Sequence, residues 1–423
     1  MGAPFDVAAV RERFPALRRT MDGRPCVFAD APGGTQVPEA VARAMAAHLL
    51  ERNANVGGTF PTSREAGADV EAGRTAAADL LGADPDEIVF GPNMTTLAFA
   101  LSRSLARRLR EGDEVVVTRL DHDANIAPWV AAAEDRGARV RWVDVREEDC
   151  TLDLGSLERA LGERTRIVAF TMASNAVGTI TAAAEVVRAA RGTDAVVIAD
   201  AVHLAQHRVL DVRALGADIA FCSPYKIFGP HLGVMYARRE LLATWTPYKV
   251  RPAPGDPPES WETGTQNHEA LVGLAAAVDY LAGIGRTSVG PGAGGRRAAV
   301  VAGMEAIAAY EATLSRRFLE GAAANADLRL YGIGDPDRTE ERTPTFAVRL
   351  GERSPREVAE ELARRGIFVW DGNYYALAIM ERLGLQASGG AVRIGFCHYN
   401  TADEVDRVLQ QLDRLGAGRR AAS

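Results

Sequence analysis

The chain has 423 residues, of which 47% are hydrophobic and 25% charged, and its formal net charge is −7, a composition typical of a soluble globular protein. This acidic balance, without any basic run, argues against a nucleic-acid binder, and the absence of a long uninterrupted apolar stretch argues against a membrane span. The N-terminus lacks the apolar segment of a signal peptide, and four scattered cysteines without metal-type spacing favour a reduced, cytoplasmic protein with no metal site.

Helical and strand patterns alternate through the first two thirds of the chain. Helices are predicted over residues 37–52, with Thr35 as a possible cap, and over 64–81, 95–109, 124–135 and 182–190. Strands are predicted over residues 87–90, 114–118, 139–143, 166–171, 195–199, 218–222 and 233–236. Continuous Val/Ile-rich strands separated by helices indicate an α/β fold with a mostly parallel sheet that is buried on both faces.

The last third changes character. A proline-rich loop over 249–259 precedes helices over 271–281 and 296–323, with a glycine-rich turn at 290–295 between them. Strands from 328 and over 346–350 and 392–395, with helices over 355–365 and 402–415, indicate a compact α+β C-terminal domain. We therefore expect an N-terminal segment (1–20) that packs on the small domain, a large cofactor-binding domain (21–285) and a small C-terminal domain (286–423).

Lysine is the most informative residue type, because only Lys226 and Lys249 occur. Lys226 lies in a Ser-Pro-Tyr-Lys turn, and Asp200 ends an apolar strand 26 residues upstream. Pyridoxal 5′-phosphate (PLP) chemistry requires one lysine to form a Schiff base and one carboxylate to hold the pyridine nitrogen protonated. The spacing therefore predicts a PLP site with Lys226 and Asp200 at its centre, although each has a simpler interpretation as a surface or capping residue.

Other polar residues follow predicted strands, where active sites of such sheets lie. Asn93, Met94 and Thr95 join a strand to a helix whose N-terminal amides suit a phosphate, although Asn93 or Thr95 can equally cap the helix. His122 can stack on a cofactor ring. Its neighbours Asp121 and Asp123 resemble metal ligands, but no second cluster supports a metal. His203 and His207 are four residues apart without the glutamate of a zinc-peptidase helix, so we interpret His203 as a cofactor contact and His207 as structural.

Over nearly all of its length the chain resembles the class V aminotransferase family of PLP fold type I, and within it the cysteine desulfurase and selenocysteine lyase branch. The stretches that carry the resemblance are Asp30–Gly34, Asp121–Trp129, Ser174–Thr179, Asp200–His203, Ser223–Lys226, Glu262–Thr265 and Tyr399–Thr401. The resemblance implies a large domain with a seven-stranded type of sheet and a smaller C-terminal domain.

The resemblance also implies roles. Lys226, Asp200 and His122 are expected in the chemistry, with His122 stacked on the ring and Asn175 near its hydroxyl. Further cofactor contacts are implied for His203, where the family has glutamine, for Ser223, and for Tyr225, where the family has histidine. Thr265 is implied to reach the phosphate of a neighbouring subunit, which predicts a homodimer with shared active sites. The substrate contacts implied are Arg393 for the carboxylate, with Ala31, Asn175 and Tyr374.

One departure bears on the reaction. Desulfurases carry a nucleophilic cysteine on a loop, and here Tyr375 stands at the matching position in Val369–Leu377. Without a thiolate to accept sulfur, ordinary desulfuration is not expected. We expect a C–S lyase that eliminates from cysteine or a cysteine S-conjugate, with Tyr375 or Tyr374 at the leaving group. The alternatives are an aminotransferase, an epimerase or a desulfurase of the same fold, and, outside enzymes, a silent PLP-binding scaffold.

Overall fold

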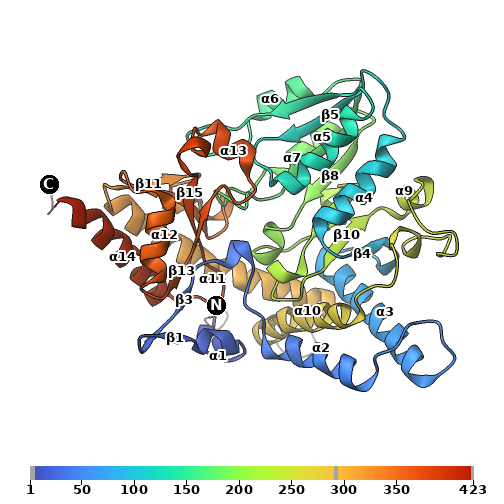
Figure 1. The fold of residues 1–423 in the computed structure, drawn as a ribbon, viewed down its shortest axis with the longest axis horizontal. Coiled ribbons are helices and arrows are strands. Elements are labelled where there is room, and N and C mark those ends of the chain that lie inside the picture. The colour runs from blue at the N-terminus through green and yellow to red at the C-terminus, as the bar shows by residue number, and fades with distance from the viewer. Residues whose placement is uncertain (1–4, 290–293, 421–423) are drawn as a thin grey trace.

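The protein was analysed as a computed structural model that describes residues 5–289 and 294–420. Residues 290–293 of the predicted glycine-rich turn and residues 1–4 of the predicted N-terminal segment lie outside the described residues. Figure 1 shows a large body built on one sheet and, beside it, a smaller body that contains the C-terminal elements.

The large sheet has seven strands in the order β4-β10-β9-β8-β7-β5-β6. Its strands are β4 (Ile88–Gly91), β5 (Glu114–Thr118), β6 (Arg139–Val143), β7 (Thr165–Thr171), β8 (Val196–Asp200), β9 (Ile219–Cys222) and β10 (Gly233–Ala237). All neighbouring pairs are parallel except those of β10, which runs antiparallel to both β4 and β9. The predicted mostly parallel sheet is therefore confirmed.

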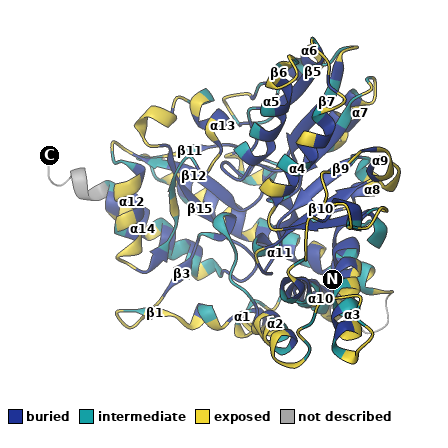
Figure 2. Ribbon diagram, turned by 45° about the vertical axis from the view of Figure 1, so that its right-hand side comes forward, coloured by how far each residue is buried: buried dark blue, intermediate teal, exposed yellow. Residues whose placement is uncertain are grey.

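Successive residues of these strands point to opposite faces, and both faces are covered by helices. On β5, for example, Val115 and Val117 pack with residues of α4 (Met94–Ala106) and α5 (Ala127–Glu134), whereas Val116 faces the other core. That second core contains residues of α3 (Pro61–Leu81), α7 (Ala183–Ala190) and α10 (His268–Val289). Figure 2 shows the sheet as a buried layer between these helices, which explains why its strands read as continuous apolar runs.

Helix α10 is the one described helix whose length and composition suffice to cross a membrane, over His268–Thr287, but 61% of that window is buried inside the protein. It packs against α2 (Glu39–Glu51), α3 and α11 (Arg296–Ala324). Its apolar character is thereby explained by these helix–helix contacts. The remaining short helices of this body are α6 (Leu154–Ala160), α8 (Val212–Leu215) and α9 (Arg239–Thr244).

The smaller body is an antiparallel sheet in the order β11-β12-β15-β14. Its strands are β11 (Leu328–Tyr331), β12 (Thr345–Leu350), β14 (Trp370–Gly372) and β15 (Ala391–Gly395), and its helices are α12 (Pro355–Ala363), α13 (Leu377–Arg382) and α14 (Ala402–Arg420). Apolar residues of α11, α12 and α14 form a separate core with this sheet.

The start of the chain contacts this smaller body. Helix α1 (Val7–Glu12) is followed by the hairpin β1 (Thr20–Met21) and β2 (Arg24–Pro25), and β3 (Val27–Phe28) pairs in parallel with β13 (Ile367–Phe368). Arg11 forms an ion pair with Glu404 at 2.9 Å. These pairings hold the turn at Asp30–Gly34 between the two bodies, beside Gly395.

Candidate active site

Lys226 and Asp200 lie at the carboxyl ends of two adjacent parallel strands. Asp200 is the last residue of β8, and Lys226 ends the short turn Pro224–Lys226 that follows β9. Both side chains are buried. Because β8 and β9 are paired in register up to Asp200 and Phe221, the fold fixes the amine and the carboxylate at the same edge of the sheet.

Burial dominates the electrostatics of this pair. Desolvation, helped by the charge of Arg393, lowers the pKa of Lys226 from 10.5 to about 7, while the negative charge of Asp200 opposes the shift. Desolvation also raises the pKa of Asp200 to about 6, although the amide of Val202, 2.8 Å from Oδ1, and the charge of Lys226 favour its ionised form. The Lys226 amine donates a hydrogen bond to the carbonyl oxygen of Pro32. A buried amine with this pKa is suited to react with a carbonyl group near neutral pH.

Thr35 was predicted to cap α2, and that prediction is wrong. The residue before α2 is Pro38, which offers no side-chain cap. The Thr35 hydroxyl instead accepts from the amide of Phe228 at 2.9 Å, and its amide donates to the carbonyl of Tyr225 at 3.1 Å. Thr35 therefore stabilises the turn that carries Lys226, a contact between segments 190 residues apart that helix-capping patterns do not reveal.

A small inner recess of about 80 Å³ surrounds Lys226 and Asp200. Its walls contain most of the predicted cofactor contacts: Asn93, Met94, Thr95, His122, Asn175, Asp200, His203, Ser223, Tyr225 and Lys226. Asn93 caps α4, because its Oδ1 accepts from the amide of Thr96 at 2.8 Å. The preceding amides of Met94 and Thr95 belong to the first helical turn, which lacks intrahelical acceptors, and so can serve an anion.

Two buried polar atoms in the recess have no hydrogen-bond partner, namely Asn175 Oδ1 and His203 Nδ1. His203 uses Nε2 toward the hydroxyls of Thr343 and Thr345, at 3.0 and 3.1 Å, and burial lowers its pKa well below the usual value. An unpaired buried polar atom is costly unless a ligand satisfies it. The amine, the acid, the helix N-terminus and these unpaired atoms together fit PLP, whose ring carries a nitrogen, a hydroxyl and a phosphate arm.

His122 lies at the boundary between the recess and a larger outer cavity of about 880 Å³. Its Nδ1 accepts from the amide of Ala124 at 3.0 Å, and burial lowers its pKa to about 4, so the ring is neutral near pH 7.

Asp121, considered above as a metal ligand, is buried and accepts hydrogen bonds from Thr118 and from Asn125. Within residues 5–289 and 294–420 no group of three or more His, Cys, Asp or Glu is arranged to hold a metal ion.

Arg393 lies on β15 of the small sheet and is buried, yet it lines the outer cavity with Asn175 and Lys226. Its Nη1 donates to the carbonyl oxygen of Asn175 at 3.0 Å, its guanidinium lies 4.4 Å from the ring centre of Tyr374, and its Nε has no partner. Burial lowers its pKa only to about 10, so it remains charged. A fixed and partly unsatisfied guanidinium is suited to bind a carboxylate.

The segment Trp370–Tyr375, which consists of β14 and the loop after it, lines the outer cavity. Tyr374 and Tyr375 have positive φ values of 54° and 57°, which non-glycine residues rarely adopt. The main chain of this loop is held by the Asn175 side chain, which donates to the Tyr374 carbonyl at 3.0 Å, and by the Asp123 amide, which donates to the Tyr375 carbonyl at 2.7 Å. The Tyr375 ring stacks on His122 at 5.5 Å while remaining 74% exposed.

Not every predicted residue joins this cluster. Thr265 is exposed and lines a different depression with Asn55 and Val56. Ala31 is buried beside Pro32 without lining either cavity. Sequence reasoning missed Gly33, Phe99 and Trp370 as cavity residues. Gly33 and Trp370 lie in sequence stretches that were already discussed. The tryptophan at position 370 is the signal in the sequence that could have identified the cavity rim, and its side chain is 52% exposed in the structure.

Comparisons with known proteins show the family and the fold to which this chain is similar. The model of the family "Aminotransferase class-V" matches residues 27–291 and 295–408. A cysteine desulfurase of Klebsiella pneumoniae is 33% identical, with 97% of this chain and 98% of that protein covered. One from Synechococcus elongatus is 32% identical over 98% of this chain, which spans 64% of that longer protein. The solved structure of a Thermococcus onnurineus cysteine desulfurase superposes with a TM-score of 0.87 at 26% identity, covering 99% of this chain and all of the other.

Proposed function

The chain belongs to the class V aminotransferase family, and from this premise we propose that it catalyses β-elimination at a carbon–sulfur bond of cysteine or of a cysteine S-conjugate, without a persulfide-carrying cysteine. It is a cysteine desulfurase-like, PLP-dependent enzyme with the type I fold. The choice between elimination and desulfuration depends on which groups near Lys226 can accept or protonate the substrate's sulfur.

The observation that carries the proposal is the absence of a thiol from the described walls of the cavity. All four cysteines are buried, and none lines the recess or the outer cavity. Burial raises the pKa of Cys150 and of Cys222 to about 12, and that of Cys397 well above its usual value. Since only the thiolate accepts sulfur, these residues are poor persulfide carriers. Tyr375 occupies the exposed loop position above His122, where the resemblance leads one to look for the cysteine.

Binding of the substrate is assigned to Arg393 and Asn175. Arg393 is presented by β15 and held by the Asn175 carbonyl, and it forms no ion pair with a described carboxylate, so its guanidinium is open to a substrate carboxylate. The Tyr374 ring supports the guanidinium from one side. This arrangement orients an amino acid with its α-carbon toward Lys226, which lines the same cavity.

Proton transfer is assigned to Lys226 and to the aromatic rim. Bound PLP supplies the electron sink for bonds that break at the substrate's α-carbon. The Lys226 amine, with its lowered pKa, is the base that takes the α-proton. Asp200 holds the opposite charge at the bottom of the recess. We assign the protonation of the leaving sulfur to the Tyr375 hydroxyl, on the exposed segment that lines the outer cavity.

The shape of the outer cavity supports a substrate larger than cysteine. The cavity has a volume of about 880 Å³, within the range of sites for whole small molecules, and its rim carries Trp370, Tyr375 and Phe99. These rings offer apolar surface for a substituent on sulfur.

A homodimer is part of the proposal, with the exposed Thr265 segment meeting a neighbouring subunit. Light scattering of the purified protein tests whether the protein is a dimer.

The decisive experiment is a product analysis. Purified holoenzyme is incubated with cysteine and with S-alkyl and S-aryl cysteines, and pyruvate, ammonia, thiol, alanine and keto acid are quantified. Elimination yields pyruvate, ammonia and thiol in equal amounts. Alanine together with protein-bound sulfur identifies the desulfurase alternative, which the names of the relatives favour. Conversion of a second keto acid to an amino acid identifies an aminotransferase, and α-proton exchange without other products identifies an epimerase.

A further inference from the structure

A second cavity, of about 940 Å³, lies at the opposite edge of the large sheet from Lys226. It is bordered by the C-terminal end of α4 and by the amino ends of β5, β7 and β8. Since α4 begins at the inner recess and β8 ends there with Asp200, the two cavities are separated by the length of these elements. Nothing in the proposed chemistry uses this second cavity.

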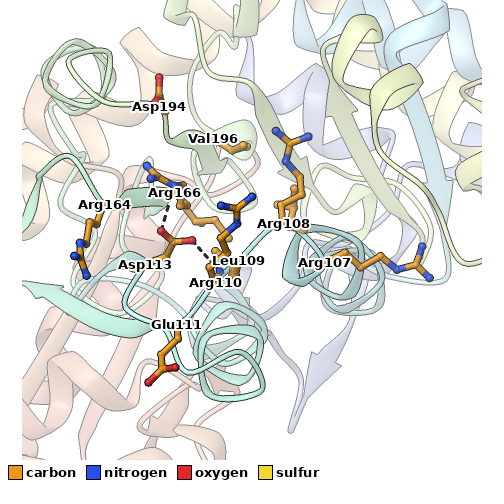
Figure 3. A pocket seen from close by; sticks show the side chains of 12 residues that line it. Arg107, Arg108, Leu109, Arg110, Glu111, Asp113, Arg164, Arg166, Asp194 and Val196 are labelled. Atoms are coloured by element: carbon orange, nitrogen blue, oxygen red, sulfur yellow. Dashed lines mark hydrogen bonds and ion pairs between the residues drawn. The ribbon is translucent and has the colours of Figure 1, made fainter.

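Its lining is unusually rich in arginine. Five arginines contribute to it, against three acids, and these residues are Arg107, Arg108, Arg110, Arg164, Arg166, Glu111, Asp113 and Asp194. Figure 3 shows Asp113 in the middle of the group, with Arg107 and Glu111 extending away from it. The formal charge of the lining is therefore +2, in a protein whose net charge is −7.

Only part of this positive charge is neutralised. Arg166 pairs with Asp113 at 3.4 Å, and Arg107 lies over the ring of Tyr248 at 4.2 Å. Among the described residues, no carboxylate oxygen lies within 4.0 Å of a guanidinium nitrogen of Arg108, Arg110 or Arg164. By contrast, Arg213, Arg238 and Arg338 each form ion pairs with two acids.

A purely structural explanation covers some of these arginines but not all. The negative end of the α4 dipole favours cations, which accounts for Arg107 and Arg108. Arg164 comes from the residue before β7 and gains nothing from that helix. The exposed Arg164 thus adds a cation that the α4 dipole does not explain and that has no ion-pair partner among the described residues.

The apolar residues below the arginines offer little surface to a ligand. Leu105, Leu109 and Ile167 belong to the adjoining core and are only 1–2% exposed, and Val196 is half-buried. The charged side chains therefore dominate the surface open to a ligand, and guanidiniums without a carboxylate partner suit a ligand that carries several negative charges.

We propose that this cavity binds a small polyanion, with two or more phosphate or carboxylate groups held by Arg108, Arg110 and Arg164. The volume of about 940 Å³ suits a molecule of nucleotide size. Because the cavity is separate from the Lys226 site, this binding stands whether or not the enzyme is a C–S lyase.

The test is calorimetric titration of the PLP-loaded enzyme, so that the cofactor's own phosphate site is filled. ATP without magnesium and pyrophosphate probe phosphates, and benzene-1,2,4-tricarboxylate probes carboxylates. We expect saturable binding of at least one of these anions at one site per chain, weakened by salt. The arm that binds identifies the anionic group.

Variants decide the location. Arg108→Ala with Arg164→Ala should weaken binding by at least about tenfold, because two charge-assisted contacts are lost. The matched control is Arg19→Ala with Arg24→Ala, which removes the same charge from exposed positions near the β1–β2 hairpin and should leave affinity unchanged. The proposal is overturned if none of the three anions binds saturably, if the cavity variant binds like the parent, or if the control variant loses as much affinity.

Discussion

Arg393 donates a hydrogen bond from Nη1 to the carbonyl oxygen of Asn175 at 3.0 Å, and this contact joins the small sheet to the loop that follows β7. The same asparagine donates from its side chain to Tyr374 at 3.0 Å. One residue of the large body thus positions both the proposed carboxylate-binding group and the loop above it. The substrate cavity is consequently assembled only when both bodies are folded against each other.

Replacing Arg393 by alanine should raise the KM for the amino-acid substrate while PLP stays bound. The loss of a charge-assisted bidentate contact costs about 2–4 kcal/mol, which corresponds to roughly 30- to 1,000-fold in affinity. Steady-state kinetics and the cofactor absorbance measure the two effects separately. Arg349→Ala on the neighbouring strand β12 is the control, since that half-buried arginine contacts Ser388 and Gly390 and does not line the cavity. An unchanged KM for Arg393→Ala contradicts the assignment.

Lys226→Ala should abolish both the covalent attachment of PLP and turnover, because Lys226 is the lysine that lines the recess. Lys249 is exposed and donates to the carbonyl of Ala253 at 2.9 Å, so Lys249→Ala should retain both. Borohydride reduction followed by peptide mass spectrometry locates the attachment. Label on a Lys249 peptide, or persistent attachment in the Lys226 variant, rules out the assignment.

The sequence predicted those features that depend on local patterns. Strands β5, β7 and β8 were recognisable because sheets buried on both faces require continuous Val/Ile runs. The antiparallel direction of β10 was not predictable, because an apolar run does not specify its partner. The two-residue strands β3 and β13 form by pairing across about 340 residues rather than by propensity. The placing of the domain boundary near residue 285 stays a prediction.

The site divides in the same way. Lys226 and Asp200 were identified by lysine counting and by strand position. Two other features of the site arise from tertiary contacts and so are not encoded in any local pattern. Thr35 supports the turn that carries Lys226, and the backbone of Tyr374 and Tyr375 is left-handed. Thr265 lines a different depression from the recess, so its implied role at the phosphate of a neighbouring subunit stays a prediction.

The uptake of PLP by the apoprotein should depend on pH through Lys226. Burial lowers its pKa to about 7, so the reactive neutral amine increases as pH rises toward 7 and is saturated above it. The second-order rate of PLP binding should therefore rise about tenfold per pH unit below 7 and level off above. Nα-acetyllysine, measured in parallel, corrects for the ionisation of PLP itself and should keep rising. A protein rate that rises in the same way up to pH 10 contradicts a lowered pKa.

Glu262→Ala should destabilise the large body strongly. Its buried carboxylate accepts from Arg74 Nη1 and from the amide of Phe90, both at 2.9 Å, and Arg74 is buried as well. Removing one partner of a buried ion pair leaves an uncompensated charge, at a cost of about 3–5 kcal/mol. Urea denaturation measures the free energy of unfolding. Asp86→Ala, which breaks the exposed Arg239–Asp86 pair, should change it by less than about 1 kcal/mol. Equal effects of the two substitutions refute this reasoning.

Single replacement of each cysteine by alanine should leave C–S lyase activity within a few-fold of the parent. A persulfide mechanism passes through one particular sulfur, so one of the four variants, Cys26→Ala, Cys150→Ala, Cys222→Ala or Cys397→Ala, would then lose nearly all turnover. An elimination mechanism needs no enzyme thiol, because the cofactor takes up the electrons and a hydroxyl or water protonates the leaving group. Buried thiols with raised pKa values agree with the second case.

Two measurements make this outcome decisive. Thiol and pyruvate release are followed for each variant, and intact-protein mass spectrometry during turnover detects any added sulfur. Tyr375→Phe serves as the matched variant on the loop: it should slow thiol release while leaving cofactor binding intact, because it removes the hydroxyl but keeps the ring that stacks on His122 at 5.5 Å. A sulfur adduct on Cys397, together with alanine as the main product, would instead establish a desulfurase that reaches its thiol by moving the strand end that follows Arg393.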